Sequence, residues 1–306
     1  MSILYWLKFF PFAKAQYERP IIKEISGPYF SKLWANNWRF VDSIFLFNAP
    51  WANPVMGFDG CGRTVGGKQP RPINILAGDL ERVFGGASDG WDLDFFYENT
   101  WYFVGPWFTG PQASLRASSL LVSASRDSEF IESNIFHPRV FEEAIANYLD
   151  KTYGYDRSGK KPHYRGPLNW RVLPISSSLQ AVVCDIHQIH NGSRENPSVS
   201  RLVFFPVSKH QFVRVLFDFG GTSIHDEIRA KPLFALCDSI IDSMHLKVGK
   251  STQAQWDQVK AICPDMSLTE SFGELPWPLI KEKPNKKPKE RDITPSDEAK
   301  RMPFKP

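Results

Sequence analysis

The sequence predicts an α+β protein with mainly antiparallel sheets and a few packed amphipathic helices. Segments with alternating apolar side chains dominate the chain, and only a few stretches carry apolar residues at helical spacing. The alternation of strands and helices is also irregular, which argues against a doubly wound parallel sheet. The order of strands, helix, strands and helices allows two similar halves, although no sequence repeat relates them.

Residues 200–248 carry the clearest pattern of the chain. Two apolar segments, SRLVFFPV and FVRVLFDFGG, flank the polar tetrapeptide SKHQ, which predicts an antiparallel hairpin. In the second strand the odd-numbered residues from Val213 to Phe219 are apolar, while the even face is mixed and partly wet. Pro206 has no N–H to donate, so the first strand is expected at a sheet edge or at a bulge.

A helix is predicted after Lys231, with Pro232 in its first turn. Its apolar residues recur at helical spacing and form one stripe, made of Leu233, Leu236, Cys237, Ile240, Ile241 and Met244. Burying this stripe does not outweigh the entropy of ordering the segment, so we expect the helix to pack on the neighbouring sheet.

Ahead of that stretch, alternation and helical spacing predict several further elements. In order, they are a short helix at 29–38, a strand at 40–47, a long loop at 48–73, a short helix at 75–84 ended by Gly85 and Gly86, a strand at 91–104 with a turn at Asn99, and a strand at 117–125.

A second clear helix is predicted from Pro138. Its apolar stripe consists of Val140, Phe141, Ala144, Ile145, Tyr148 and Leu149. Strands are expected at 170–175 and 179–189, and a last helix is expected at 252–262 with Ser251 as its N-cap.

The polar residues 156–168 are the best candidate for an internal boundary. They would connect an aromatic-rich α+β region, residues 1–155, to a second α+β region, residues 169–278. Residues 279–306 are basic and rich in proline and hold almost no apolar residues, which predicts a disordered tail.

The net charge of +4 belongs to the C-terminal tail. Residues 281–306 hold nine Lys and Arg against five Asp and Glu, so 37 − 9 = 28 cations face 33 − 5 = 28 anions in the other 280 residues. The folded body is therefore not expected to bind nucleic acid. The four cysteines form no C-x-x-C pair, which predicts reduced thiols, and the sequence gives no reason to expect a metal or a cofactor.

Residues 3–12 form an apolar N-terminal segment. The segment is too short to span a bilayer, and it lacks the charged start and the cleavage site of an export signal. We interpret it as a packed arm of a cytoplasmic protein, with peripheral membrane contact as the alternative, and we expect no stable membrane insertion.

Two motifs approach the spacing of nucleotide and kinase sites. Residues 62–68, GRTVGGK, match a phosphate loop, but Gln69 replaces the Ser or Thr that would hold magnesium, and no helix start follows. The tripeptide Asp-Phe-Gly at 218–220 has none of the other kinase motifs beside it and is interpreted as a strand end.

Ser88 lies in a G-x-S-x-G sequence, the pattern of a hydrolase nucleophile. That pattern requires a strand before the serine and a helix after it, whereas the sequence predicts the reverse order. Asp185 and His187 are available as partners, so a serine hydrolase stays an alternative. Together with His190 they also resemble a metal site, but the three side chains do not share one strand face unless the strand ends near residue 188.

Several aromatic stretches carry a family resemblance. GPYFSKLWANNWRF, LAGDLERVFGG and DLDFFYENTWYFVG, with the later FVRVLFDF and CDSIIDSMHL, resemble the immunity proteins of bacterial polymorphic-toxin and type VI secretion systems. In particular they are similar to the α+β group that is paired with restriction-endonuclease-like toxins. The resemblance implies a cytoplasmic antidote that binds one cognate toxin and blocks its active site, with no catalytic residues of its own.

A nuclease toxin would present a basic substrate cleft, and acidic groups would meet it. Asp89, Asp92, Asp94 and Glu98 form the densest acidic and aromatic run and are the predicted partner-binding residues. The alternatives are a serine hydrolase that uses Ser88 and a non-catalytic, membrane-associated accessory protein that uses residues 3–12.

Overall fold

The computed structural model confirms the α+β class, with helices packed on sheets that are mainly antiparallel. It describes residues 27–28, 33–50, 73–74, 85–88, 90–104, 111–153, 164–190, 193–222 and 225–275. The predicted N-terminal arm, residues 51–72 of the loop predicted at 48–73, the helix at 75–84, most of the polar connector and the C-terminal tail lie outside these residues.

The larger sheet has seven described strands in the order β4-β5-β6-β10-β9-β8-β7, with every neighbouring pair antiparallel. Its strands are β4 (Gly85–Ser88), β5 (Trp91–Val104), β6 (Pro111–Ala124), β7 (Tyr164–Pro174), β8 (Gln180–His190), β9 (Ser193–Ser208) and β10 (Gln211–Gly220). The sheet therefore takes strands from both sides of the predicted connector.

The smaller sheet has the order β11-β2-β1-β3, and only β3 runs parallel to its neighbour. Its strands are β1 (Leu33–Phe40), β2 (Ser43–Pro50), β3 (Ile73–Asn74) and β11 (His245–Lys247). Because β11 follows the second region of the chain and pairs with β2 from the first, this sheet also joins the two regions.

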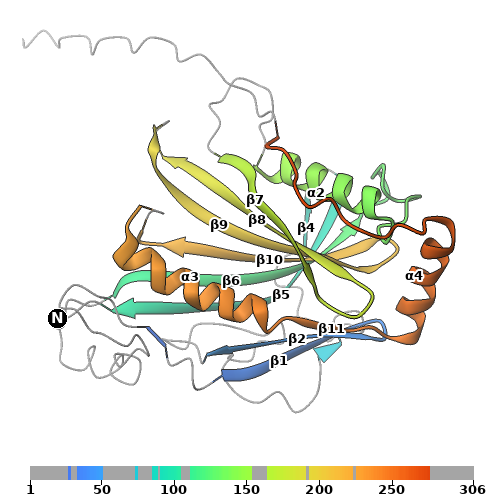
Figure 1. The fold of residues 1–306 in the computed structure, drawn as a ribbon, viewed down its shortest axis with the longest axis horizontal. Helices are drawn as coiled ribbons and strands as arrows, with labels where there is room; N and C mark the ends of the chain where they lie inside the picture. The colour runs from blue at the N-terminus through green and yellow to red at the C-terminus, as the bar shows by residue number, and fades with distance from the viewer. Residues whose placement is uncertain are drawn as a thin grey trace, which may run out of the picture.

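The helices α2 (Pro138–Tyr153) and α3 (Glu227–Asp242) lie on opposite sides of the larger sheet (Figure 1). The first face of that sheet packs against α3, the smaller sheet and α4 (Lys250–Ile262) in one large buried cluster. The second face packs against α2 and the segment 263–275, which we call the strap. No helix among the described residues is long and apolar enough to cross a membrane.

The first face is filled with aromatic rings. Trp38 stacks on Phe47 at 5.3 Å between ring centroids and meets Phe96 and Tyr97 at 5.4 and 5.2 Å. Trp38 and Trp101 are both fully buried. The described aromatic side chains of the first region therefore lie largely in the core.

The hairpin predicted at 200–219 is confirmed as β9 and β10, which a two-residue turn at Lys209 and His210 connects. Of the two interpretations of Pro206, the bulge is right, because β9 is a central strand and its register with β10 shifts beside Pro206. The even face of β10 is less wet than expected, since Phe212 and Arg214 are buried beneath α2.

The helix α3 begins earlier than predicted. Asp226 caps its first turn by accepting a hydrogen bond from the Arg229 N–H, so Pro232 lies inside the helix and the predicted first-turn position was wrong. The six predicted stripe residues are nevertheless all buried against the first face. The stripe of α2 was also predicted correctly, with Val140 half-buried and its other members buried.

Three predictions in the first region differ from the structure. Residues 33–40 form strand β1 rather than part of a helix, because they pair with β2 along eight positions. β5 continues through Asn99 without a turn, and its register with β6 shifts instead at a bulge at Phe96 and again between Phe103 and Val104. The bulge lets both Phe96 and Tyr97 enter the core of the first face. Gly85 and Gly86, expected to end a helix, lie in β4.

The first turn of α4 is capped by another element. Ser251 is not the N-cap as predicted, since the helix begins at Lys250 after Gly249. Asp42, in the turn between β1 and β2, accepts hydrogen bonds from the Ser251 N–H at 2.6 Å and the Thr252 hydroxyl at 3.0 Å. This contact ties α4 to the smaller sheet.

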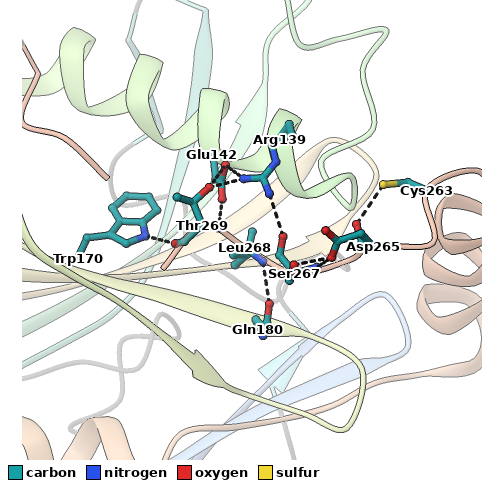
Figure 2. Close-up of polar contacts among 9 residues, drawn as sticks. All are labelled: Arg139, Glu142, Trp170, Gln180, Cys263, Asp265, Ser267, Leu268 and Thr269. Atoms are coloured by element: carbon teal, nitrogen blue, oxygen red, sulfur yellow. Dashed lines mark hydrogen bonds and ion pairs between the residues drawn. The ribbon is translucent and has the colours of Figure 1, made fainter. Parts of the chain in front are cut away.

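The strap is held on the second face by a buried carboxylate (Figure 2). Glu142 of α2 accepts hydrogen bonds from the N–H and the hydroxyl of Thr269 and pairs with Arg139 at 2.6 Å. The Trp170 indole N–H donates to the Thr269 carbonyl at 2.8 Å, and its ring stacks on Phe272. The strap thus links α2 to β7.

Candidate functional site

The predicted acidic residues lie on β5, next to the edge strand β4. Asp92 is exposed, and Asp94 and Glu98 are half-buried. Asp89 lies outside the described residues.

The bulge at Phe96 splits this acidic run between the two faces of the sheet. Asp94 is in register with Leu121, whose side chain belongs to the first face, and Asp92 shares that side. Glu98 is in register with Ser118, and it therefore lies on the second face. Its carboxylate is 2.7 Å from the Arg116 guanidinium, so its charge is already compensated. Glu98 does not share a surface with the other two.

A second set of carboxylates lies at the same end of the sheet but toward the second face, where Phe130 of its loop packs and Glu129 contacts α2. The loop between β6 and α2 carries Asp127, Glu129 and Glu132, which are all exposed. Its start is fixed to the turn before β5, because the Ser125 N–H donates to the Gly90 carbonyl at 3.0 Å. We call these five residues, Asp92, Asp94, Asp127, Glu129 and Glu132, the acidic end.

The acidic end carries excess negative charge. Among the described residues of this end, two cations, Arg126 and Lys209, accompany the five carboxylates, so their summed formal charge is 2 − 5 = −3. His210 lies beside Lys209, and burial and then the lysine lower the pKa of its imidazole. A lowered pKa keeps this histidine neutral at pH 7, so it does not offset the carboxylates.

Packing holds the acidic loop in one conformation. Trp91 of β5 stacks on Phe130 with 5.2 Å between centroids. Its indole N–H donates to Asn147 of α2 at 3.0 Å, and the Asn147 amide donates to Glu129 at 2.8 Å. The Ile135 N–H also bonds the Lys209 carbonyl at 2.8 Å. The carboxylates are therefore presented by a preorganised surface.

Ser88 does not occupy a nucleophile elbow. It ends β4, is in register with Trp91, and is followed by a tight turn in which Gly90 has a φ of 94°. A β-hairpin stands where the elbow needs a helix. Its predicted partner Asp185 is engaged elsewhere, because its carboxylate accepts two hydrogen bonds from Arg201, at 2.8 and 3.2 Å, and one from Asn169 at 2.9 Å.

Among the described residues, the fold does not assemble the metal-site or kinase patterns into a site. Burial lowers the pKa of His187, and no group of three or more metal-ligating side chains gathers within the described part of the chain. Asp218, Phe219 and Gly220 end β10, as predicted. The phosphate-loop pattern at 62–68 lies outside the described residues.

Sequence reasoning missed the loop half of the acidic end. The run RDSEFIE at 126–132 holds three carboxylates and could have been noted as acidic. Its closeness to β5 depends on strand register, which places Trp91 opposite Ala124 and so joins the loop to the Gly90 turn.

Comparison of the chain with protein-family models, with curated proteins and with solved structures found no match.

Proposed function

We propose that this chain is an immunity protein, which binds a cognate secreted toxin in the cytoplasm and neutralises it by blocking the toxin's active site. The acidic end is the surface that meets the toxin. The observation that carries the proposal is the −3 charge of five carboxylates on a loop and strand that are fixed by packing. The family resemblance of the aromatic stretches supports the same function.

Physical chemistry favours a basic partner for this surface. Carboxylates on a rigid frame attract a cationic cleft at long range and increase the rate of encounter, which falls with salt. Their fixed positions reduce the entropy lost on binding. A nuclease toxin has such a cleft, because it must bind the phosphates of its substrate. Occupying that cleft would exclude the nucleic acid.

The binding test uses the product of the open reading frame adjacent to this gene, purified as an inactive variant. The double variant Asp92→Asn with Asp127→Asn should raise its dissociation constant about tenfold or more, because two exposed charges leave the contact. The matched control is Asp242→Asn with Asp257→Asn, which removes two exposed charges from α3 and α4 and should leave affinity unchanged.

The same proteins test neutralisation in cells. Expression of the active adjacent product should arrest growth, and co-expression of this chain should restore it. Failure of the wild-type chain to bind that product or to restore growth would overturn the proposed function. Equal losses of affinity in both double variants would instead remove the acidic end as the contact surface.

A further inference from the structure

Arg214 is a buried arginine without a carboxylate partner. It lies on β10, on the second face of the larger sheet, and retains 8% of its surface. Six other arginines each have a guanidinium nitrogen within 3.3 Å of a carboxylate oxygen: Arg116, Arg139, Arg165, Arg171, Arg201 and Arg229. Among the described residues no carboxylate lies that close to Arg214. A buried charge in this situation is costly, which makes the exception informative.

Two neutral hydroxyls take the place of a counter-ion. The Arg214 Nε donates to the Tyr148 hydroxyl and its Nη1 donates to the Ser118 hydroxyl, both at 3.2 Å. Tyr148 comes from α2 and Ser118 from β6, so three elements converge on the guanidinium. A guanidinium stays protonated at every physiological pH.

The donors at this point outnumber the acceptors. Both hydroxyls accept from Arg214, and each still has a proton to donate. The second terminal nitrogen, Nη2, forms no hydrogen bond with any described residue. Five hydrogen-bond donors, three guanidinium N–H groups and two hydroxyl protons, therefore remain without an acceptor among the described residues. An oxyanion supplies what they lack, since it is negative and accepts from several donors at once.

Asp218 does not fill that role. It lies on the same side of β10, four residues further along the strand. Its carboxylate accepts a hydrogen bond from the Ser200 hydroxyl at 2.6 Å and makes no direct ion pair with Arg214. The other nearby acid, Glu98, is paired with Arg116. No carboxylate among the described residues therefore pairs directly with Arg214, although Asp218 lies close enough to favour its charged form.

Half-buried residues surround this point beyond the end of α2. Tyr153 in the last turn of α2 meets Tyr164 of β7 edge to face at 5.1 Å. Leu216 and Asp218 are half-buried on the sheet floor, and Arg116 is exposed beside them.

We propose that Arg214, Tyr148 and Ser118 form a receptor for one oxyanion, a carboxylate or a phosphate group. Nη2 and the Tyr148 hydroxyl hold the anion, and Ser118 adds a third hydrogen bond. The receptor lies on the second face and does not involve the acidic end. It is a binding site beyond the proposed function and does not depend on that function.

The first test measures the melting temperature of the full chain in sodium acetate, sodium phosphate and sodium chloride at one pH and one ionic strength. A ligand that binds only the folded state raises the melting temperature, here by about 2–4 °C at saturation. A rise with acetate alone assigns a carboxylate, and a rise with phosphate alone assigns a phosphate. Equal melting temperatures in all three salts would overturn the proposal.

Variants separate specific binding from general salt effects on stability. Tyr148→Phe keeps the ring and removes one hydroxyl, and it should abolish most of the anion-dependent rise. Ser118→Ala should also reduce the anion-dependent rise in melting temperature. It replaces Tyr148→Phe as the test variant if that protein does not fold. Tyr97→Phe is the matched control, because it removes a buried hydroxyl on the opposite face and should keep the full rise. An undiminished rise in both test variants would also overturn the proposal.

Discussion

The two faces of the larger sheet are closed in different ways. The first face is sealed by rings, with Trp38, Phe96 and Tyr97 packed between the two sheets. Three of its buried polar atoms, the Trp38 Nε1, the Tyr97 hydroxyl and the Ser119 hydroxyl, have no hydrogen-bond partner among the described residues, whereas the Trp101 indole N–H donates to the Pro50 carbonyl. The second face combines an apolar cluster with hydrogen-bonded polar groups, as at Glu142 and Arg214.

This difference separates scaffold from adaptable surface. Apolar packing on the first face is non-directional and joins both regions of the chain into one core. The second face depends on directional contacts of single residues, such as those that hold the strap. Substitutions on the first face should therefore weaken the whole protein, and substitutions on the second face should act locally.

The largest expected effect comes from Trp38→Ala. The indole is fully buried and touches four other rings, so its removal leaves a cavity that the two sheets cannot fill. We expect a loss of about 3–5 kcal/mol in the free energy of unfolding, measured by urea denaturation. The matched substitution on the second face is Trp170→Ala, which should cost less because its ring stacks on the strap. Equal losses would contradict the difference between the faces.

A smaller effect is expected from Glu142→Gln. The amide oxygen of glutamine can keep one hydrogen bond to Thr269, but the charged contact with Arg139 is lost. The free energy of unfolding should fall by about 1–2 kcal/mol. Amide hydrogen exchange at Leu268 and Thr269 should rise while exchange in α3 does not. Glu143→Gln is the control, since this neighbour in α2 is exposed, and it should change neither quantity.

The smallest effect is expected from Tyr97→Phe. Burial raises the pKa of the Tyr97 phenol far above its ordinary value, although the nearby Asn99 side chain lowers it, and the hydroxyl forms no hydrogen bond of normal geometry with a described residue. Removing a buried hydroxyl without a partner costs little and can stabilise the fold, so a change within about 1 kcal/mol of zero is expected. Urea denaturation that showed a loss of several kcal/mol would mean that the first face holds a polar contact after all.

The spacing of apolar residues predicted correctly those elements in which the pattern fits only one type of secondary structure. In α2 and α3 the apolar residues recur at helical spacing only, and in the β9–β10 hairpin they alternate as strands require. The helix predicted at 29–38 was wrong where β1 forms, because the aromatic residues from Tyr29 to Trp38 fit both a helical and a strand spacing. Pairing with β2 decides in favour of the strand. No local pattern records such a pairing.

The candidate site was predicted only in part, for the same reason. Asp92 and Asp94 could be found from the acidic run, but the bulge at Phe96 that separates them from Glu98 requires knowledge of the register with β6. Arg214 was interpreted as part of a partly wet strand face. It is buried because α2 crosses that face, and the helix comes from more than 60 residues earlier in the chain.

Hydrogen–deuterium exchange of the chain, alone and with the adjacent gene product, tests the central claim most directly. If the acidic end is the contact surface, the partner should slow exchange in residues 91–94 and 125–133 and leave α3 and the strap unchanged. Protection confined to α3, α4 or the strap, with none at the acidic end, would contradict the account.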